Sequence, residues 1–327
     1  MIGKPKRTMA AILLLLLAAG GFMYGSRWFP ERGPVDITVI VKSTDASIEF
    51  WEVLIDGVEE ASQEFDADVR VTGSRTEADV DEQIAAVEQA IVEKPDAIVL
   101  AATDYDRLVP VAEKVRKSGI KLIIVDSGIN SDAPHSNVAT DNVQAGRKAG
   151  EAMRKQLQGP AKVAIISYMK NAASHIDREK GVRSVLEGQP GIELLDTFYV
   201  ESSEENAYRI AKEILQTQPD VVGIVGLNEP TTVGAGRAIK ELAVQERVSL
   251  IGFDSSVNEI KLLDEGVMKA TVIQRPFQMG YLSMKTAVEA VRGDKVPKVI
   301  DTGSLLITKD NMYEEENQKL LFPFVNN

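Results

Sequence analysis

The segment SLIGFDSSV, residues 249–257, places a carboxylate directly after a run of apolar residues. Leu250, Ile251 and Phe253 predict a buried strand, and Asp254 stands at its end. Burying a carboxylate is unfavourable unless a partner stabilises its charge. Either this segment caps the helix that follows it, or the carboxylate accepts hydrogen bonds from a ligand.

Other strand ends carry similar side chains. Asp126 follows the apolar run IKLIIV, Asn228 follows VVGIVG, and Gln274 ends KATVIQ. Arg178 lies in the polar segment after AKVAIIS. In open parallel α/β sheets ligands bind outside the carboxyl ends of the strands, so these side chains are expected to meet in one pocket. For each of these residues considered singly, helix capping is the alternative to ligand contact. Planar carboxylate, amide and guanidinium groups suit a ligand rich in vicinal hydroxyls, because each group can pair with two of them.

Two aromatic residues and one histidine are further candidates. Phe50 and Trp51 start a predicted helix, where they either cover the apolar face of a sugar ring or pack in the core. His175 is a possible ligand contact or an ordinary loop histidine. His135 and His175 lack metal-ligand spacing, and without cysteine a zinc site is not expected. The sequence predicts no metal, no cofactor and no catalytic residue.

Apolar strands alternate with amphipathic helices along the chain. This alternation predicts parallel sheets covered by helices on both faces, and the number of strands favours two doubly wound α/β lobes. The predicted strands are 36–41, 68–73, 96–102, 120–126, 161–167, 192–200, 220–226, 248–253 and 269–274. The first predicted helix carries Phe50 and Phe65 on one face. The helices predicted after it are 79–94, 107–117, 142–157, 176–188, 204–217, 231–243, 256–265 and 277–292. The segment YEEENQK near the end is interpreted as a solvated tail.

The amino-acid composition excludes several classes of function. The 327 residues contain no cysteine, which excludes disulfides, thiol catalysis and lipid attachment through cysteine. The net charge is -12, and no basic face is evident, so no nucleic-acid partner is expected.

The N-terminal residues 1–30 predict export. Lys4, Lys6 and Arg7 precede an uncharged apolar run over residues 9–25, which as a helix would span about 26 Å. Basic residues before such a run place the remainder of the chain outside the cytoplasm. Residues 18–21 would serve as a cleavage site if this segment is a signal peptide. We favour a retained membrane anchor, because the apolar run continues beyond them.

From about residue 35 to 309 the sequence resembles the ribose-type periplasmic sugar-binding proteins of ABC transporters. The ordered motifs FWEVLIDGVEEA, LIIVDSG, VATDNVQAGRKAGE, DREKGV, VGLNEPTTVGA, IGFDSS and ATVIQRPFQMG carry the resemblance. It implies two Rossmann-like lobes joined by three hinge crossings. The lobes would comprise residues 35–140 plus 275–303 and residues 141–274 plus 304–327. It also implies a monosaccharide held by Asp126, Arg178, Asn228, Asp254 and Gln274, with Phe50 and Trp51 stacked on the ring.

Three departures from the family pattern leave the sugar open. Ser47 and Ile48 replace the usual Asn-Asn-Pro run, Ser127 stands where Arg is frequent, and the segment ESSEEN lacks an aromatic residue. A pentose, a hexose, an inositol or a furanone-type signal would each fit. Repressors share this module, but they need a DNA-binding headpiece where this chain has an apolar segment.

The resemblance implies that the lobes close on the ligand about a hinge. The closed form would then be presented to an ABC permease. The alternative is a membrane-anchored sensor subunit that signals to a histidine kinase. An enzyme is a third possibility, but the sequence offers no nucleophile–base pair and no cofactor motif.

Overall fold

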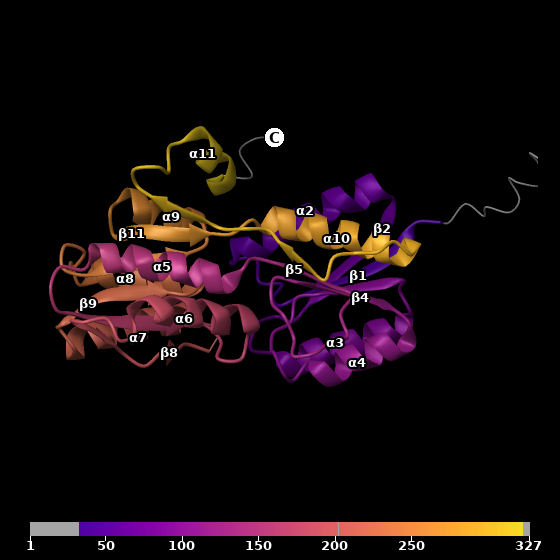
Figure 1. Cartoon of the computed structure of the whole chain (residues 1–327), viewed down its shortest axis with the longest axis horizontal. Helices are drawn as coiled ribbons and strands as arrows, with labels where there is room; N and C mark the ends of the chain where they lie inside the picture. The colour runs from indigo at the N-terminus through magenta and orange to yellow at the C-terminus, as the bar shows by residue number, and fades with distance from the viewer. Residues whose placement is uncertain (1–32, 202, 323–327) are drawn as a thin grey trace, which may run out of the picture. The chain divides into compact units, whose positions relative to one another are not determined.

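The computed structural model describes residues 33–201 and 203–322, which contain two sheets with helices on both faces (Figure 1). Within these residues the first sheet has the order β12-β5-β4-β3-β1-β2. Its strands β3, β4, β5 and β12 pair in parallel, and β3 also pairs in parallel with β1. The strands are β1 (Val35–Val41), β2 (Ala67–Gly73), β3 (Ala97–Leu100), β4 (Lys121–Val125), β5 (Ser136–Ala139) and β12 (Val299–Asp301).

The second sheet has the order β13-β11-β10-β9-β6-β7, with β8 also paired to β6. Every pairing is parallel except that of β11 with β13. Its strands are β6 (Ala161–Ser167), β7 (Ile192–Leu194), β8 (Phe198–Tyr199), β9 (Val221–Gly226), β10 (Ser249–Phe253), β11 (Met268–Ile273) and β13 (Leu305–Thr308).

Helices cover both faces of each sheet. On the first sheet α2 (Glu49–Phe65) and α10 (Pro276–Arg292) lie on one face, and α3 (Val80–Glu93) and α4 (Val109–Ser118) lie on the other (Figure 1). On the second sheet α5 (Asn142–Gln156) and α6 (Ala173–Leu186) share one apolar cluster with the strands. The helices α7 (Glu204–Thr217), α8 (Glu229–Glu241) and α9 (Val257–Asp264) share another.

Strand β6 shows why the chain folds in this way. Val163 and Ile165 pack into the cluster with α5 and α6, while Ala164 and Ile166 pack into the cluster with α7 and α8. Successive side chains of a strand point to opposite faces, so a strand covered by helices on both sides must be apolar throughout. The apolar run VAII, residues 163–166, therefore encodes a strand that is covered on both faces.

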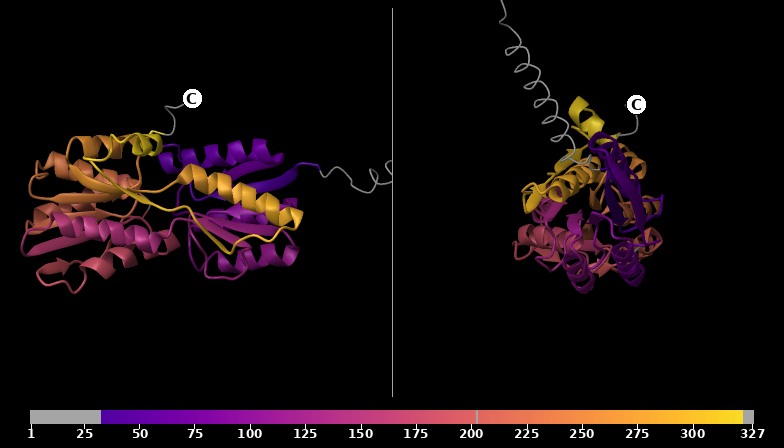
Figure 2. Two further views of the ribbon diagram at one scale, coloured as in Figure 1. Left: turned by 45° about the horizontal axis from the view of Figure 1, so that its top comes forward. Right: turned by 90° about the vertical axis from the view of Figure 1, so that its right-hand side faces the viewer.

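The described chain passes between the sheets three times. It leaves the first sheet after β5 and enters α5, returns from β11 into α10, and leaves again from β12 into β13. The left view of Figure 2 shows the last two of these passages. The short helix α11 (Glu315–Leu321) follows β13.

The α/β class and the alternation of strands and helices are confirmed, whereas several details are wrong. Strands β5, β12 and β13 were not predicted, because they are only three or four residues long and two of them lie at sheet edges. The predicted strand 192–200 is broken into β7 and β8. Between them the Thr197 hydroxyl donates to Glu179 of α6 at 2.7 Å, which draws the chain out of the ladder. Part of the predicted solvated tail forms α11 instead.

Within residues 33–201 and 203–322, none of the helices has the length and apolar character needed to cross a bilayer. The anchor predicted over residues 9–25 lies outside the described residues.

Candidate functional site

A cavity lies at the carboxyl ends of strands from both sheets. Its lining includes Phe50, Trp51, Asp126, His175, Arg178, Asn228, Asp254 and Gln274, which are all the site residues that the sequence predicts. We call it the ligand cavity. Lys42, Ile48, Glu77, Ser174, Glu229 and Pro230 complete its lining. Strand-end placement therefore does bring these side chains together, although they are spread over more than two hundred positions of sequence.

Asp254 is held at the end of β10 by neighbours from two other segments. Its Oδ1 accepts a hydrogen bond from Nε2 of Gln274 at 2.7 Å, and its Oδ2 accepts one from the backbone N–H of Glu229 at 3.1 Å. The residue has φ 78°, in the left-handed region that side chains rarely adopt. The helix after it is capped by Ser256, whose hydroxyl accepts from the Glu259 N–H. Asp254 is therefore not the cap of α9.

Arg178 is a buried cation positioned by neutral groups. Its Nε donates to Oδ1 of Asn142 at 2.8 Å, and one Nη donates to the carbonyl of Leu227 at 2.7 Å. Its guanidinium lies over the Phe253 ring, 4.7 Å from the centroid. The side chain is only 2% exposed. Because no acid pairs with it in the described chain, its charge is available to the cavity.

Asn228 has two roles. Its Oδ1 accepts from the N–H and the hydroxyl of Thr231, so it caps α8 as the capping alternative predicts. Its side-chain amide also lines the ligand cavity. Helix capping and a position in the cavity are thus not exclusive for this residue.

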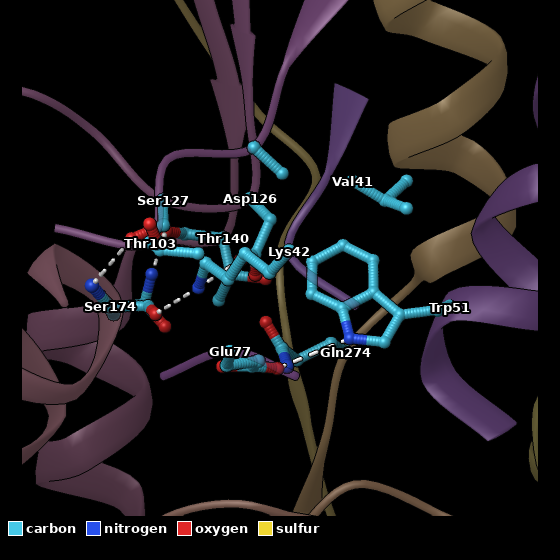
Figure 3. A network of polar contacts seen from close by, with 12 residues as sticks. Val41, Lys42, Trp51, Glu77, Thr103, Asp126, Ser127, Thr140, Ser174 and Gln274 are labelled. Atoms are coloured by element: carbon cyan, nitrogen blue, oxygen red, sulfur yellow. Dashed lines mark hydrogen bonds and ion pairs between the residues drawn. The ribbon is translucent and has the colours of Figure 1, made fainter. Parts of the chain in front are cut away.

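Asp126 is already paired with a lysine that the sequence analysis missed. Nζ of Lys42 lies 2.7 Å from Oδ2 of Asp126, and it also donates to the hydroxyl of Ser174 at 3.3 Å. Figure 3 shows Lys42 between these two residues. Asp126, like Asp254, has a positive φ, here 62°. Lys42 directly follows β1, so it stands at a strand end like the predicted residues.

Both aromatic residues line the cavity, and one of them is largely core. Trp51 is 3% exposed, and its Nε1 donates to Oε1 of Glu77 at 3.1 Å (Figure 3). Phe50 is half-buried and meets the Trp51 ring edge to face at 5.0 Å. Glu77 follows β2 and, like Lys42, is a charged cavity residue that the sequence analysis missed.

His175 is buried within α6, which begins at Ala173 rather than at the predicted residue 176. Burial lowers its pKa well below the usual value, and the positive charges of Lys42 and Arg178 lower it further. The imidazole is therefore neutral near pH 7 and able to donate and accept hydrogen bonds.

An acidic cluster borders the cavity at Glu229, Asp254 and Glu259. Burial raises the pKa of Glu229 to about 8, and the charges of Asp254 and Glu49 contribute to the rise. Burial also raises the pKa values of Asp254 and Glu259. Glu229 is therefore largely protonated near neutral pH.

The histidine and acidic side chains of residues 33–201 and 203–322 form no group of three or more that could hold a metal ion. The arrangement instead offers paired hydrogen-bond donors and acceptors, with aromatic faces beside them. Such a set can hold a small polyhydroxylated molecule without breaking a bond.

Comparison with known proteins gives a consistent result. Residues 37–295 match the profile of the family described as periplasmic binding protein domain. A carbohydrate transporter solute-binding protein from Agrobacterium radiobacter, solved with D-arabinose, has a TM-score of 0.85 and 31% identity, over 88% of this chain and 99% of that one. An ABC transporter solute-binding protein from Agrobacterium vitis, solved with D-fucose, has a TM-score of 0.84 and 33% identity over the same shares. The D-ribose/D-allose-binding protein of Pseudomonas aeruginosa is 26% identical over 88% of this chain and 92% of its own length.

Proposed function

The chain belongs to the periplasmic binding protein domain family, and from this premise we propose that it binds a monosaccharide in the ligand cavity and delivers it to an ABC sugar importer. It is a binding protein and not an enzyme, in keeping with relatives that are named as sugar-binding proteins. The family is extracytoplasmic, which agrees with the export that the N-terminal sequence predicts.

One observation carries the assignment to a sugar. Asp126, Arg178, Asn228, Asp254 and Gln274 leave different strands and helices, yet they line one cavity together with Phe50 and Trp51. Carboxylates accept from hydroxyls, the guanidinium donates to them, and the amides do both. The aromatic faces complement the C–H face of a sugar ring. The relatives solved with D-arabinose and D-fucose support this class of ligand.

We further propose that the protein works by closure of two lobes, residues 35–140 plus 275–303 and residues 141–274 plus 304–327. The three passages between the sheets would act as the hinge. Two hydrogen bonds would break when the lobes open. The Val257 N–H donates to the Glu49 carboxylate at 3.2 Å, and Nζ of Lys42 donates to the Ser174 hydroxyl. The ligand cavity measures only about 30 Å³, the volume of about one water molecule, so a sugar ring would enter and fit only with the lobes further apart than in this structure.

The relatives favour a role in transport, since the Haemophilus influenzae relative is named as a ribose import binding protein. The alternative of a sensor subunit for a histidine kinase depends on a retained membrane anchor. That anchor falls on residues 9–25, outside the described chain, and no contact in the described residues favours it.

A thermal-shift screen of the full-length protein tests this function. The panel comprises D-ribose, D-allose, D-arabinose, D-fucose and the inositols. A ligand at a hundred times its dissociation constant adds about 2.7 kcal/mol to the free energy of unfolding, a shift of several degrees in Tm. We expect one or two of these sugars to stabilise the protein strongly. A flat response to the whole panel would contradict sugar binding.

A further inference from the structure

A larger cavity adjoins the ligand cavity beside the start of α10. It has a volume of about 320 Å³ and shares Phe50, Glu229, Asp254 and Gln274 with the lining of the ligand cavity. We call this space the outer chamber. Because four side chains face both spaces, a molecule bound in the ligand cavity would border directly on the outer chamber.

The far wall of the outer chamber has an apolar part among polar side chains. Val53 on α2, Pro276 and Phe277 on α10, and Leu320 on α11 line it. Phe277 is 40% exposed, more than any other aromatic side chain of the described chain except Tyr313. An exposed aromatic face on a cavity offers a surface on which a flat or weakly polar ring can stack.

Two side chains that line the outer chamber, Arg275 and Gln274, each have a polar atom without a partner in the described residues. Arg275 Nε and Gln274 Oε1 are both buried and make no hydrogen bond within the described residues. Arg275 also has no carboxylate within ion-pair distance in that part of the chain, although most arginines of the described residues are paired with a carboxylate or bonded to a carbonyl. Unsatisfied buried donors and acceptors are rare and point to a missing partner.

We propose that the outer chamber is a subsite for a second ring, so that the preferred ligand is a glycoside rather than a free monosaccharide. This inference rests on the proposed function, because the first ring must occupy the ligand cavity. The second ring stacks on Phe277 and Phe50. Its substituents accept a hydrogen bond from Arg275 and donate one to Gln274. A second sugar and an aryl group share this chemistry, and the assay below separates them.

Isothermal titration of the full-length protein tests the subsite. The probes are D-ribose, D-allose, D-arabinose and D-fucose, each compared with its methyl glycoside and its 4-nitrophenyl glycoside in both anomeric forms. The disaccharides lactose and melibiose, compared with methyl β-D-galactoside and methyl α-D-galactoside respectively, provide the sugar arm. We expect at least one 4-nitrophenyl glycoside or disaccharide to bind about tenfold or more tightly than the corresponding methyl glycoside.

Two variants assign any such gain to the chamber. In Phe277→Ala, the 4-nitrophenyl glycosides and disaccharides should bind about as tightly as the corresponding methyl glycosides, so the ratio of the two affinities should fall to near one. Arg275→Gln should reduce the ratio for a disaccharide more than the ratio for an aryl glycoside. Val92→Ala, an exposed apolar residue on α3, and Arg292→Gln at the far end of α10 are the matched controls.

The outcomes separate the two proposals. Free sugars that bind more tightly than every two-ring compound would overturn the subsite and leave sugar binding intact. A tenfold gain that survives Phe277→Ala would also overturn it. Absence of binding by all the free sugars and all their glycosides would overturn the proposed function together with the subsite.

Discussion

Nζ of Lys42 lies 2.7 Å from Oδ2 of Asp126, and the two side chains are only 2% and 4% exposed. The ion pair joins the ends of β1 and β4 inside the ligand cavity. It gives the cavity a fixed donor and a fixed acceptor side by side, which is the arrangement that orients neighbouring hydroxyls. The first prediction follows from this pair.

Breaking the Lys42–Asp126 pair should destabilise the protein. Removing one partner leaves a buried charge uncompensated, which costs about 3 to 5 kcal/mol of unfolding free energy. We therefore expect large losses in urea titrations of Lys42→Met and of Asp126→Leu. The double variant should be more stable than either single variant, yet should not bind sugar. A double variant whose loss equals the sum of the two single losses would contradict a direct pair.

Removal of the Asp254 carboxylate should abolish measurable sugar binding. Hydrogen bonds to a charged group contribute about 1.5 to 3 kcal/mol each, so losing two of them lowers affinity by about two orders of magnitude or more. Asp254→Asn in a titration with the best-binding sugar checks this, with the exposed Asp132→Asn as control. Tm of the variant must be followed as well. Unchanged affinity would show that Asp254 serves only to order Gln274 and Glu229.

Stability should fall as pH rises between the unfolded and folded pKa values of Glu229. The folded pKa is about 8 against an ordinary 4.5, so in this window the native state binds a proton that the unfolded chain has released. The contribution of Glu229 to the free energy of unfolding is fully present below pH 4.5. It is lost as pH rises through about 8, at no more than about 1.4 kcal/mol per pH unit. The charges of Asp254 and Glu49 raise its pKa, and Glu259 also interacts with it, whereas Lys42, Arg178, Arg275 and Lys319 are the basic side chains that line the same cavities.

Glu229→Gln provides the check on this pH dependence. The amide cannot ionise, so urea titrations of the variant between pH 5 and pH 9 should show a flatter profile than those of the unmodified protein. If the free energy of unfolding depended equally steeply on pH in both proteins, the titrating group would be another member of the acidic cluster.

The contact between α2 and α10 should tolerate no side chain at its two glycines. A Cβ at Gly57 would lie 2.0 Å from the carbonyl oxygen of Phe277, and one at Gly280 would lie 2.0 Å from that of Leu54. Overpacking of this kind costs about 1 to 3 kcal/mol. Gly57→Ala should therefore lower stability. It should also weaken sugar binding, because α2 carries Phe50 and Trp51.

The control for this contact is Gly33→Ala, where an added Cβ meets no atom within 4 Å. Its unfolding free energy and sugar affinity should match those of the unmodified protein. If Gly57→Ala behaved in the same way, the close approach of the two helices would not be required for the site.

The sequence predicts the central strands and the cavity residues for one reason. A parallel strand buried on both faces must be apolar, so the first polar residue after it marks the ligand-binding edge, as Asp126 and Asp254 do. Edge strands such as β12 escape detection because they are short and only partly covered. Lys42 was overlooked because a single lysine after a strand is ordinary on a solvated surface. Its burial depends on the distant partners Asp126 and Ser174, which no local pattern reveals.

The outer chamber could not be predicted from sequence at all. Its walls come from α2, α10 and α11, which are distant in the chain, and α11 lies in a segment interpreted as a solvated tail. Gln274 was recognised as a strand end, but the lack of a partner for its Oε1 is visible only once its neighbours are placed.

A crystal structure of the full-length protein with the sugar that gives the largest thermal shift would show where that sugar binds. We expect one sugar ring in the ligand cavity, with hydroxyls within hydrogen-bond distance of Asp254 and Arg178 and a ring face against Phe50 or Trp51. A sugar bound elsewhere, with the ligand cavity unchanged, would contradict this expectation.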